Sequence, residues 1–194
     1  MTLPMLSHAT EWNLAQLMHD LEQARPNHAR FVEKKSIAML DKAVESSGEL
    51  FFSAPDHLEK RTLKPKPESM IVDGGKLVIE RGSKKYRLQL QDYPELAAFI
   101  NSIRGTLAGD ILALERNYLL SLEGNAEHWV LHLVPTDKKM LAVLKRIHIA
   151  GEHDQVRSIE VTQSDGDSAL MTIENIPSEN IPENISSKKL DTPQ

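Results

Sequence analysis

Cysteine is absent from the 194-residue chain, and its absence removes three kinds of chemistry at once. Disulfide bridges, thiolate nucleophiles and thiolate metal sites all need that side chain. Basic residues are not clustered either, because they occur as scattered pairs such as Lys34-Lys35 and Lys84-Lys85, whereas nucleic-acid binding needs concentrated positive charge. No apolar run approaches the ~20 residues that span a bilayer. The sequence therefore predicts neither a nucleic-acid partner nor a membrane-spanning helix.

Catalytic and cofactor motifs are also lacking. The sequence has no glycine-rich phosphate loop, no Gly-x-Ser-x-Gly elbow and no His-Glu-x-x-His run. His128 and His132 are four residues apart on an expected strand, so they share a face but stand ~13 Å apart, too far to ligate one metal ion. Asp165-Gly166-Asp167 lacks the other ligands of a calcium loop and fits a hairpin turn. We expect no enzymatic activity, no cofactor and no metal.

What remains is a globular chain of mixed periodicity, with 40% hydrophobic residues and a net charge of -5. Helices are predicted over residues 11–24, capped by Thr10, and over 94–107, with a short third helix from Asp110. Gly105 and Gly109 are expected to break the second helical segment. Alternating apolar residues between turns predict strands over 29–37, 48–53, 57–63, 69–72, 76–80, 84–90, 118–122, 128–134, 144–150, 156–163 and 169–173. Residues 139–143 fit either a helical turn or a strand.

The first third of the chain has an ordered set of features that is more specific than any one of them. An aromatic residue on the first strand precedes a Gly-acid-Leu-aromatic strand that ends at a proline. A second proline, an apolar strand, an Asp-Gly turn and another apolar strand follow. In this sequence these features are Phe31, Gly48–Phe52, Pro55, Pro65, Met70–Val72, Asp73-Gly74 and Leu77–Ile79. The set resembles the LolA-like lipoprotein carriers of the bacterial periplasm, over about residues 12–173.

The resemblance implies an α+β fold, in which an unclosed antiparallel β-barrel of about eleven strands has its concave side covered by α-helices acting as a lid. It also implies a periplasmic monomer that binds acyl chains of lipoproteins or other lipids in a hydrophobic cavity. Such a carrier moves them from an inner-membrane transporter toward an outer-membrane acceptor. The expected cavity residues are Phe31, Leu50, Phe52, Leu77, Ile79, Leu88 and Leu90 from the sheet, and Leu96, Phe99, Ile100 and Ile103 from the lid.

Periodicity alone leaves the role of these residues open. A sheet packed on helices buries the same apolar faces whether or not a cavity lies between them. The pattern by itself favours a filled core, and the resemblance favours a cavity. The alternative function is an envelope adaptor that docks another envelope protein, with a filled core and no lipid ligand.

The sequence departs from the family pattern at two positions. Ala54 stands where carriers have an arginine that hydrogen-bonds the lid and holds the empty form closed, and alanine has no side-chain donor. We therefore expect apolar contacts to hold the lid. Lys60 stands where a tryptophan is typical. Because a buried lysine is costly unless paired, we expect this part of the cavity to be wetter or to meet an anion.

The two ends of the chain differ from the expected single LolA-like domain over residues 10–173. Ser7-His8-Ala9 is a small-x-small triplet of the kind that signal peptidase cleaves, which predicts that residues 1–9 are the remnant of a signal sequence. The alternative is that the triplet is accidental. Residues 174–194 repeat Glu-Asn-Ile-Pro with few packing side chains, so we expect a flexible low-complexity tail.

Overall fold

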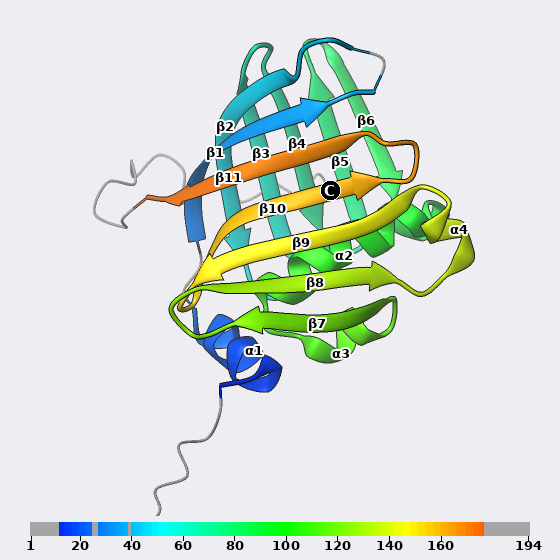
Figure 1. The fold of residues 1–194 in the computed structure, drawn as a ribbon. Coiled ribbons are helices and arrows are strands. Elements are labelled where there is room, and N and C mark those ends of the chain that lie inside the picture. Colours follow the sequence, from blue (N-terminus) through cyan, green and yellow to red (C-terminus); the bar gives the residue numbers. More distant parts are fainter. Residues whose placement is uncertain (1–11, 25–26, 39, 177–194) are drawn as a thin grey trace, which may run out of the picture.

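The computed structural model describes residues 12–24, 27–38 and 40–176, and shows one curved antiparallel sheet with helices inside its curve (Figure 1). The sheet is not closed, so the expected α+β class and unclosed barrel are confirmed. Its eleven strands are β1 (Asn27–Ser36), β2 (Val44–Ser53), β3 (His57–Lys64), β4 (Glu68–Asp73), β5 (Lys76–Arg81), β6 (Lys84–Gln89), β7 (Tyr118–Gly124), β8 (Trp129–Pro135), β9 (Leu144–Glu152), β10 (Gln155–Gln163) and β11 (Ser168–Asn175). The helices are α1 (Leu14–Gln23), the 3-10 helix η1 (Leu90–Asp92), α2 (Pro94–Leu107), α3 (Ile111–Glu115) and α4 (Lys138–Leu141).

The strand order is β6-β5-β4-β3-β2-β1-β11-β10-β9-β8-β7. The first and last strands pair in the middle of the sheet, where Phe31 lies opposite Ile173. The two edge strands, β6 and β7, are consecutive in sequence and are joined by η1, α2 and α3. The chain therefore crosses from one sheet edge to the other through its helices, and this crossing carries α2 over the concave side (Figure 1).

Glycines fix the turns and one irregular position of the first half-sheet. The β4–β5 hairpin turns at Asp73-Gly74 and the β5–β6 hairpin at Gly82, and both glycines have positive φ (54° and 60°), which costs other residues strain. Gly48 follows a register shift between β2 and β3. A Cβ at Gly48 would lie 1.9 Å from the Arg61 carbonyl oxygen, so only glycine fits there.

The helices agree with the predicted ranges except in detail. α2 begins at Pro94 and ends at Leu107 as predicted, but Gly105 does not break it. Instead, a Cβ at Gly105 would lie 3.0 Å from a methyl of Leu114, so the glycine lets α3 pack closely on α2. The predicted Thr10 cap of α1 lies outside the described residues, and Asn13 caps the helix by accepting a hydrogen bond from the Gln16 N–H.

The structure also bears on two further expectations, and two terminal ones stay untested. Residues 139–143 fitted either a helical turn or a strand, and residues 139–141 belong to the short helix α4. β11 continues to Asn175, beyond the expected start of the tail at residue 174. The expected signal remnant and the tail from residue 177 lie outside the described residues.

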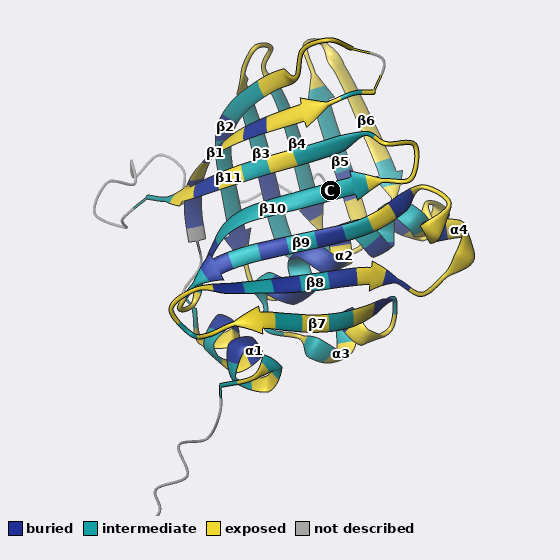
Figure 2. Cartoon of the chain, viewed as in Figure 1, coloured by how far each residue is buried: buried dark blue, intermediate teal, exposed yellow. Residues whose placement is uncertain are grey.

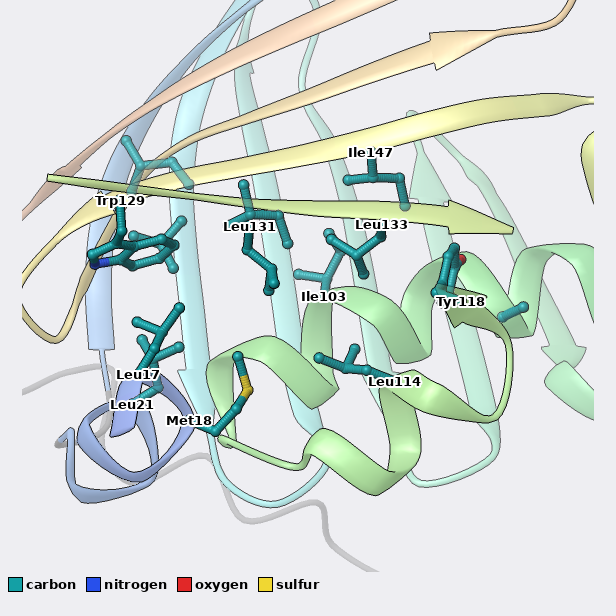
Figure 3. Close-up of a cluster of buried hydrophobic side chains, with 14 of the residues drawn as sticks. Leu17, Met18, Leu21, Ile103, Leu114, Tyr118, Trp129, Leu131, Leu133 and Ile147 are labelled. Atoms are coloured by element: carbon teal, nitrogen blue, oxygen red, sulfur yellow. The ribbon is translucent and has the colours of Figure 1, made fainter. Parts of the chain in front are cut away.

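Two apolar clusters anchor the helices to the two flanks of the sheet. The larger one packs α1, α2 and α3 against β7, β8 and β9 around Trp129, whose indole N–H donates to the His153 carbonyl at 2.9 Å (Figure 3). Figure 2 shows the same burial along β8 and β9. The smaller cluster joins β4 and β5 to α2 through Val72, Leu77 and Ile100. The middle of the sheet faces the space between these clusters.

Within the described residues, every helix is too short or too polar to cross a membrane.

Candidate functional site

A cavity of about 350 Å³ lies between the concave face of the middle strands and α2. Its volume is near the lower end of the ~300–1,000 Å³ range typical of small-molecule sites. The apolar lining comes from both halves of the sheet and from the helix: Ala29, Leu50, Phe52, Leu58, Met70, Val72, Phe99, Ile100, Ile103, Leu107, Val156, Ile159, Val161, Ala169, Met171 and Ile173. The polar lining residues are Glu33, Lys35, Lys60 and Gln163.

The strand register explains this distribution. Side chains alternate between the faces of a strand, so Ala29, Phe31 and Glu33 of β1 share the concave face. Lys35 and Gln163 lie toward the β1–β2 and β10–β11 turns, since Lys35 precedes the last residue of β1 and Gln163 ends β10. Lys60 starts from the middle of β3, and its side chain reaches toward this end to meet Glu33. The cavity thus has a polar end at these turns and an apolar end against α2.

The residues predicted for the cavity fall into three groups. Leu50 and Phe52 of β2 line it, as do Phe99, Ile100 and Ile103 of α2. A second group packs in or against the smaller apolar cluster, where β5, β6 and η1 meet α2: Leu77, Ile79, Leu88, Leu90 and Leu96. Phe31 is buried on the concave face, beneath the ammonium group of Lys60.

Sequence reasoning missed the wall formed by β10 and β11. Ile159 and Val161 of β10, with Ala169, Met171 and Ile173 of β11, complete the cavity opposite β2 and β3. Their period-two spacing was visible in the sequence. What the sequence did not show is that β11 pairs with β1, which places this wall beside the first strands.

The polar end holds a cluster of charges, here named the Glu33 cluster: Glu33, Lys35, Lys60 and Ser46. Lys60 Nζ donates to Glu33 Oε2 at 2.8 Å and lies 4.8 Å from the centre of the Phe31 ring. Ser46 Oγ donates to the same oxygen at 3.3 Å, and Lys35 Nζ lies 3.7 Å from it. The anion that Lys60 was expected to meet is thus a carboxylate of the chain itself.

Lys60 and Glu33 come from β3 and β1, so their ion pair spans the intervening strand β2. Lys60 pairs with Leu50 of β2, and Glu33 pairs with Ser46. Gly48 is the residue between these two positions on the concave face of β2. Because it has no side chain, nothing on β2 blocks the path from Lys60 to Glu33.

The electrostatics of the Glu33 cluster favour an ionised carboxylate. Burial by itself raises the pKa of Glu33, but the hydrogen bond and charge of Lys60, with the charge of Lys35, lower it below its usual value. The polar end of the cavity then holds one carboxylate and two lysines, so it carries a net positive charge.

A charged contact also holds the lid, which we define as α2. Arg104 Nη1 donates to the Gly74 carbonyl of the β4–β5 turn at 2.8 Å, and Nη2 lies 3.6 Å from Asp56 of the β2–β3 turn. Burial lowers the pKa of Arg104, and the charges of Asp56 and Asp73 oppose that effect. The lid was expected to rely on apolar contacts, because Ala54 has no donor. The structure adds an arginine that reaches from the lid to the sheet, here named the Arg104 anchor.

The histidines that the structure describes do not line this cavity. His132 points away from the core, since Trp129 and Leu131 of the same strand face inward, and its ring meets His148 edge to face at 4.5 Å. Burial, and then the neighbouring His132 and Arg146 side chains, lower the pKa of His148, which favours its neutral form. In the part of the chain that the structure describes, no group of three or more histidine or acidic residues is placed to hold a metal ion.

The open sheet, the helical lid and the apolar cavity together place the chain in the open-barrel class of α+β folds. The chain belongs to a LolA-like family, described as "outer membrane lipoprotein carrier protein LolA-like". The model of this family matches residues 7–175. This is a family of binding and carrier proteins. No curated protein matches the chain.

Several solved structures are similar to this chain at low sequence identity. A LolA superfamily protein from Nitrosomonas europaea is 10% identical with a TM-score of 0.49, and the match covers 91% of this chain and 98% of that one. MucB is 14% identical with a TM-score of 0.50, over 88% of this chain and 61% of MucB. A domain from Vibrio parahaemolyticus, described as an outer membrane lipoprotein-sorting protein, is 10% identical with a TM-score of 0.45. That match covers 88% of this chain and 93% of the domain. At 14% identity, the match to MucB is evidence for the fold and not for function.

Proposed function

We propose that the protein is a periplasmic carrier that binds the acyl chains of lipoproteins or other lipids in its cavity and transports them toward the outer membrane. The observation that carries this proposal is the apolar cavity of about 350 Å³ between the concave face of the sheet and the lid. A filled core would leave no such space. Family membership supports the same function.

The energetics of the site suit an acyl chain. Each methylene group that enters an apolar site contributes roughly 0.8 kcal/mol, so a chain of several methylenes binds without a specific hydrogen bond. The walls are aliphatic on both sides, with Leu50 and Met70 opposite Ile159 and Met171. Such walls fit a flexible chain better than a planar polar ligand.

A cavity-filling substitution tests the proposal. Ala169→Phe places a ring in the cavity, because Ala169 lines it from β11. The matched control is Leu170→Phe, one residue further on the opposite face, where the side chain is 46% exposed. We expect Ala169→Phe to weaken binding of the neutral fluorescent probe N-phenyl-1-naphthylamine at least tenfold and Leu170→Phe to leave it unchanged.

The same experiment separates the carrier from the adaptor. If the folded wild-type protein does not bind the probe, or if both variants bind the probe as tightly as the wild type, the cavity is not a ligand site. A docking function of the outer surface then becomes the better explanation.

A further inference from the structure

We propose that the Glu33 cluster recognises an anionic group at the polar end of an acyl ligand, so that the cargo is an amphiphile ending in a carboxylate or phosphate rather than a neutral lipid. This inference rests on the proposed carrier function and names the chemistry of its ligand. Its starting point is the position of two lysines and one carboxylate on the wall of an otherwise apolar cavity.

The charge balance of the cluster favours an anion. Of the described residues that line the cavity, Glu33, Lys35 and Lys60 are the charged ones, and they sum to one positive charge. Lys60 has three N–H donors, and one of them is engaged by Glu33. Lys35 lies 3.7 Å from the same carboxylate oxygen, beyond hydrogen-bond distance. Donors therefore remain for an anion that approaches from the cavity.

Stability alone does not explain a charged pair at this place. Replacing a buried ion pair by apolar side chains of similar volume is often neutral or stabilising, because both ions lose hydration in the pair. Lys60 lies on a concave face where its neighbours Leu50, Leu58 and Met70 are apolar. An aliphatic side chain in its position would extend the apolar wall, so its charge has a use beyond packing.

The location of the cluster matches the way an amphiphile enters such a cavity. Lys35 is 53% exposed, so the polar end is in contact with water, while the end against α2 is apolar. A ligand bound with its chain toward α2 keeps its anionic group near Lys35 and Lys60. The group then retains part of its hydration, which avoids the cost of burying an unpaired charge.

The test compares three probes of equal chain length: dodecanoate, dodecyl phosphate and the neutral dodecanol. Each competes with N-phenyl-1-naphthylamine for the purified full chain at about pH 8, where both acids are ionised. The variants are Lys35→Met and the double variant Glu33→Gln/Lys60→Met, which leaves no orphaned buried charge. The matched control is Lys34→Met, since Lys34 is 62% exposed and on the opposite face of the same strand.

We expect the wild type to bind at least one anionic probe about tenfold more tightly than dodecanol, as one charged hydrogen bond provides. Lys35→Met leaves Glu33 and Lys60 as a neutral pair and should lose this preference. The double variant keeps the charge of Lys35 but lacks the Lys60 donors, so its preference should be reduced. Both variants should keep their affinity for dodecanol, and Lys34→Met should keep the full preference. The stronger of the two anionic probes assigns the group as carboxylate or phosphate.

Equal binding of all three probes to the wild type overturns the inference and leaves the carrier function intact. So does an anionic preference that survives in both cluster variants. If no probe displaces the dye, the proposed function itself fails, and the two failures are thereby distinguished. Lys35→Met keeps the test decisive even if the double variant does not fold, because Lys35 is largely exposed.

Discussion

The Arg104 anchor predicts how strongly the lid is held on the sheet. Arg104→Met removes the guanidinium but keeps an unbranched stem that packs as before. The lost hydrogen bond to the Gly74 carbonyl is charged, and such bonds contribute about 1.5–3 kcal/mol. The Asp56 pair adds only ~0–1 kcal/mol, because Asp56 is 46% exposed and 3.6 Å away.

In Arg104→Met, the free energy that favours the closed lid over the open one should therefore fall by roughly 2 kcal/mol. Since each ~1.4 kcal/mol is a factor of ten, the open state should gain about thirtyfold in population. Hydrogen exchange of α2 amides, followed by mass spectrometry, measures that opening directly. Binding of N-phenyl-1-naphthylamine should become tighter in the same variant, because less free energy is needed to open the lid.

The matched control is Arg116→Met, an exposed arginine just after α3. Its α2 exchange should equal that of the wild type. If Arg104→Met and Arg116→Met give the same α2 exchange, the Arg104 anchor does not hold the lid, and the apolar contacts are sufficient.

Three further predictions concern the lid, the sheet and the Glu33 cluster. Ala54→Arg supplies the donor that carriers have before the first proline, so it should slow α2 exchange and weaken probe binding; no change in either quantity shows that position 54 does not act on the lid. Gly48→Ala should lower the free energy of unfolding in urea by about 1–3 kcal/mol, because its Cβ would lie 1.9 Å from a backbone oxygen. Gly75→Ala, with open space around its Cβ, should change it by under ~0.5 kcal/mol, and equal effects would refute the steric argument. Because the folded pKa of Glu33 is lowered, its stabilisation is present above the unfolded pKa of ~4.3 and lost as pH falls through the folded value. The stability gap between wild type and Glu33→Gln should thus narrow in acid, and a gap independent of pH would contradict it.

Much of the fold was predictable because its signals are local. The Asp73-Gly74 turn, the proline at the start of α2 and the period-two strands all act within a few residues. The exceptions depend on distant contacts. Glycine weakens an isolated helix, so Gly105 predicts a break. In the folded chain α2 continues through Gly105, because Leu114 of α3 packs closely against the glycine. The pairing of β1 with β11 joins opposite ends of the chain, and no local pattern specifies it.

For the site, the sequence predicted which side chains of a strand face inward, but not which of them line the cavity. Leu77 and Leu50 both face inward, yet Leu77 packs under α2 whereas Leu50 borders the cavity. The difference depends on where α2 crosses the sheet, which strand periodicity does not contain. The ion pair of Glu33 with Lys60 likewise joins residues on β1 and β3, and required the strand register.

The proposed carrier function requires that the cavity hold an acyl chain. Native mass spectrometry of the protein, purified without detergent from bacteria that export it to the periplasm, tests this claim most directly. We expect a population heavier than the polypeptide by the mass of an acylated molecule. This population should be lost in Ala169→Phe but not in Leu170→Phe. A wild-type spectrum that contains only the bare polypeptide, with the cavity variant indistinguishable from it, would contradict the claim.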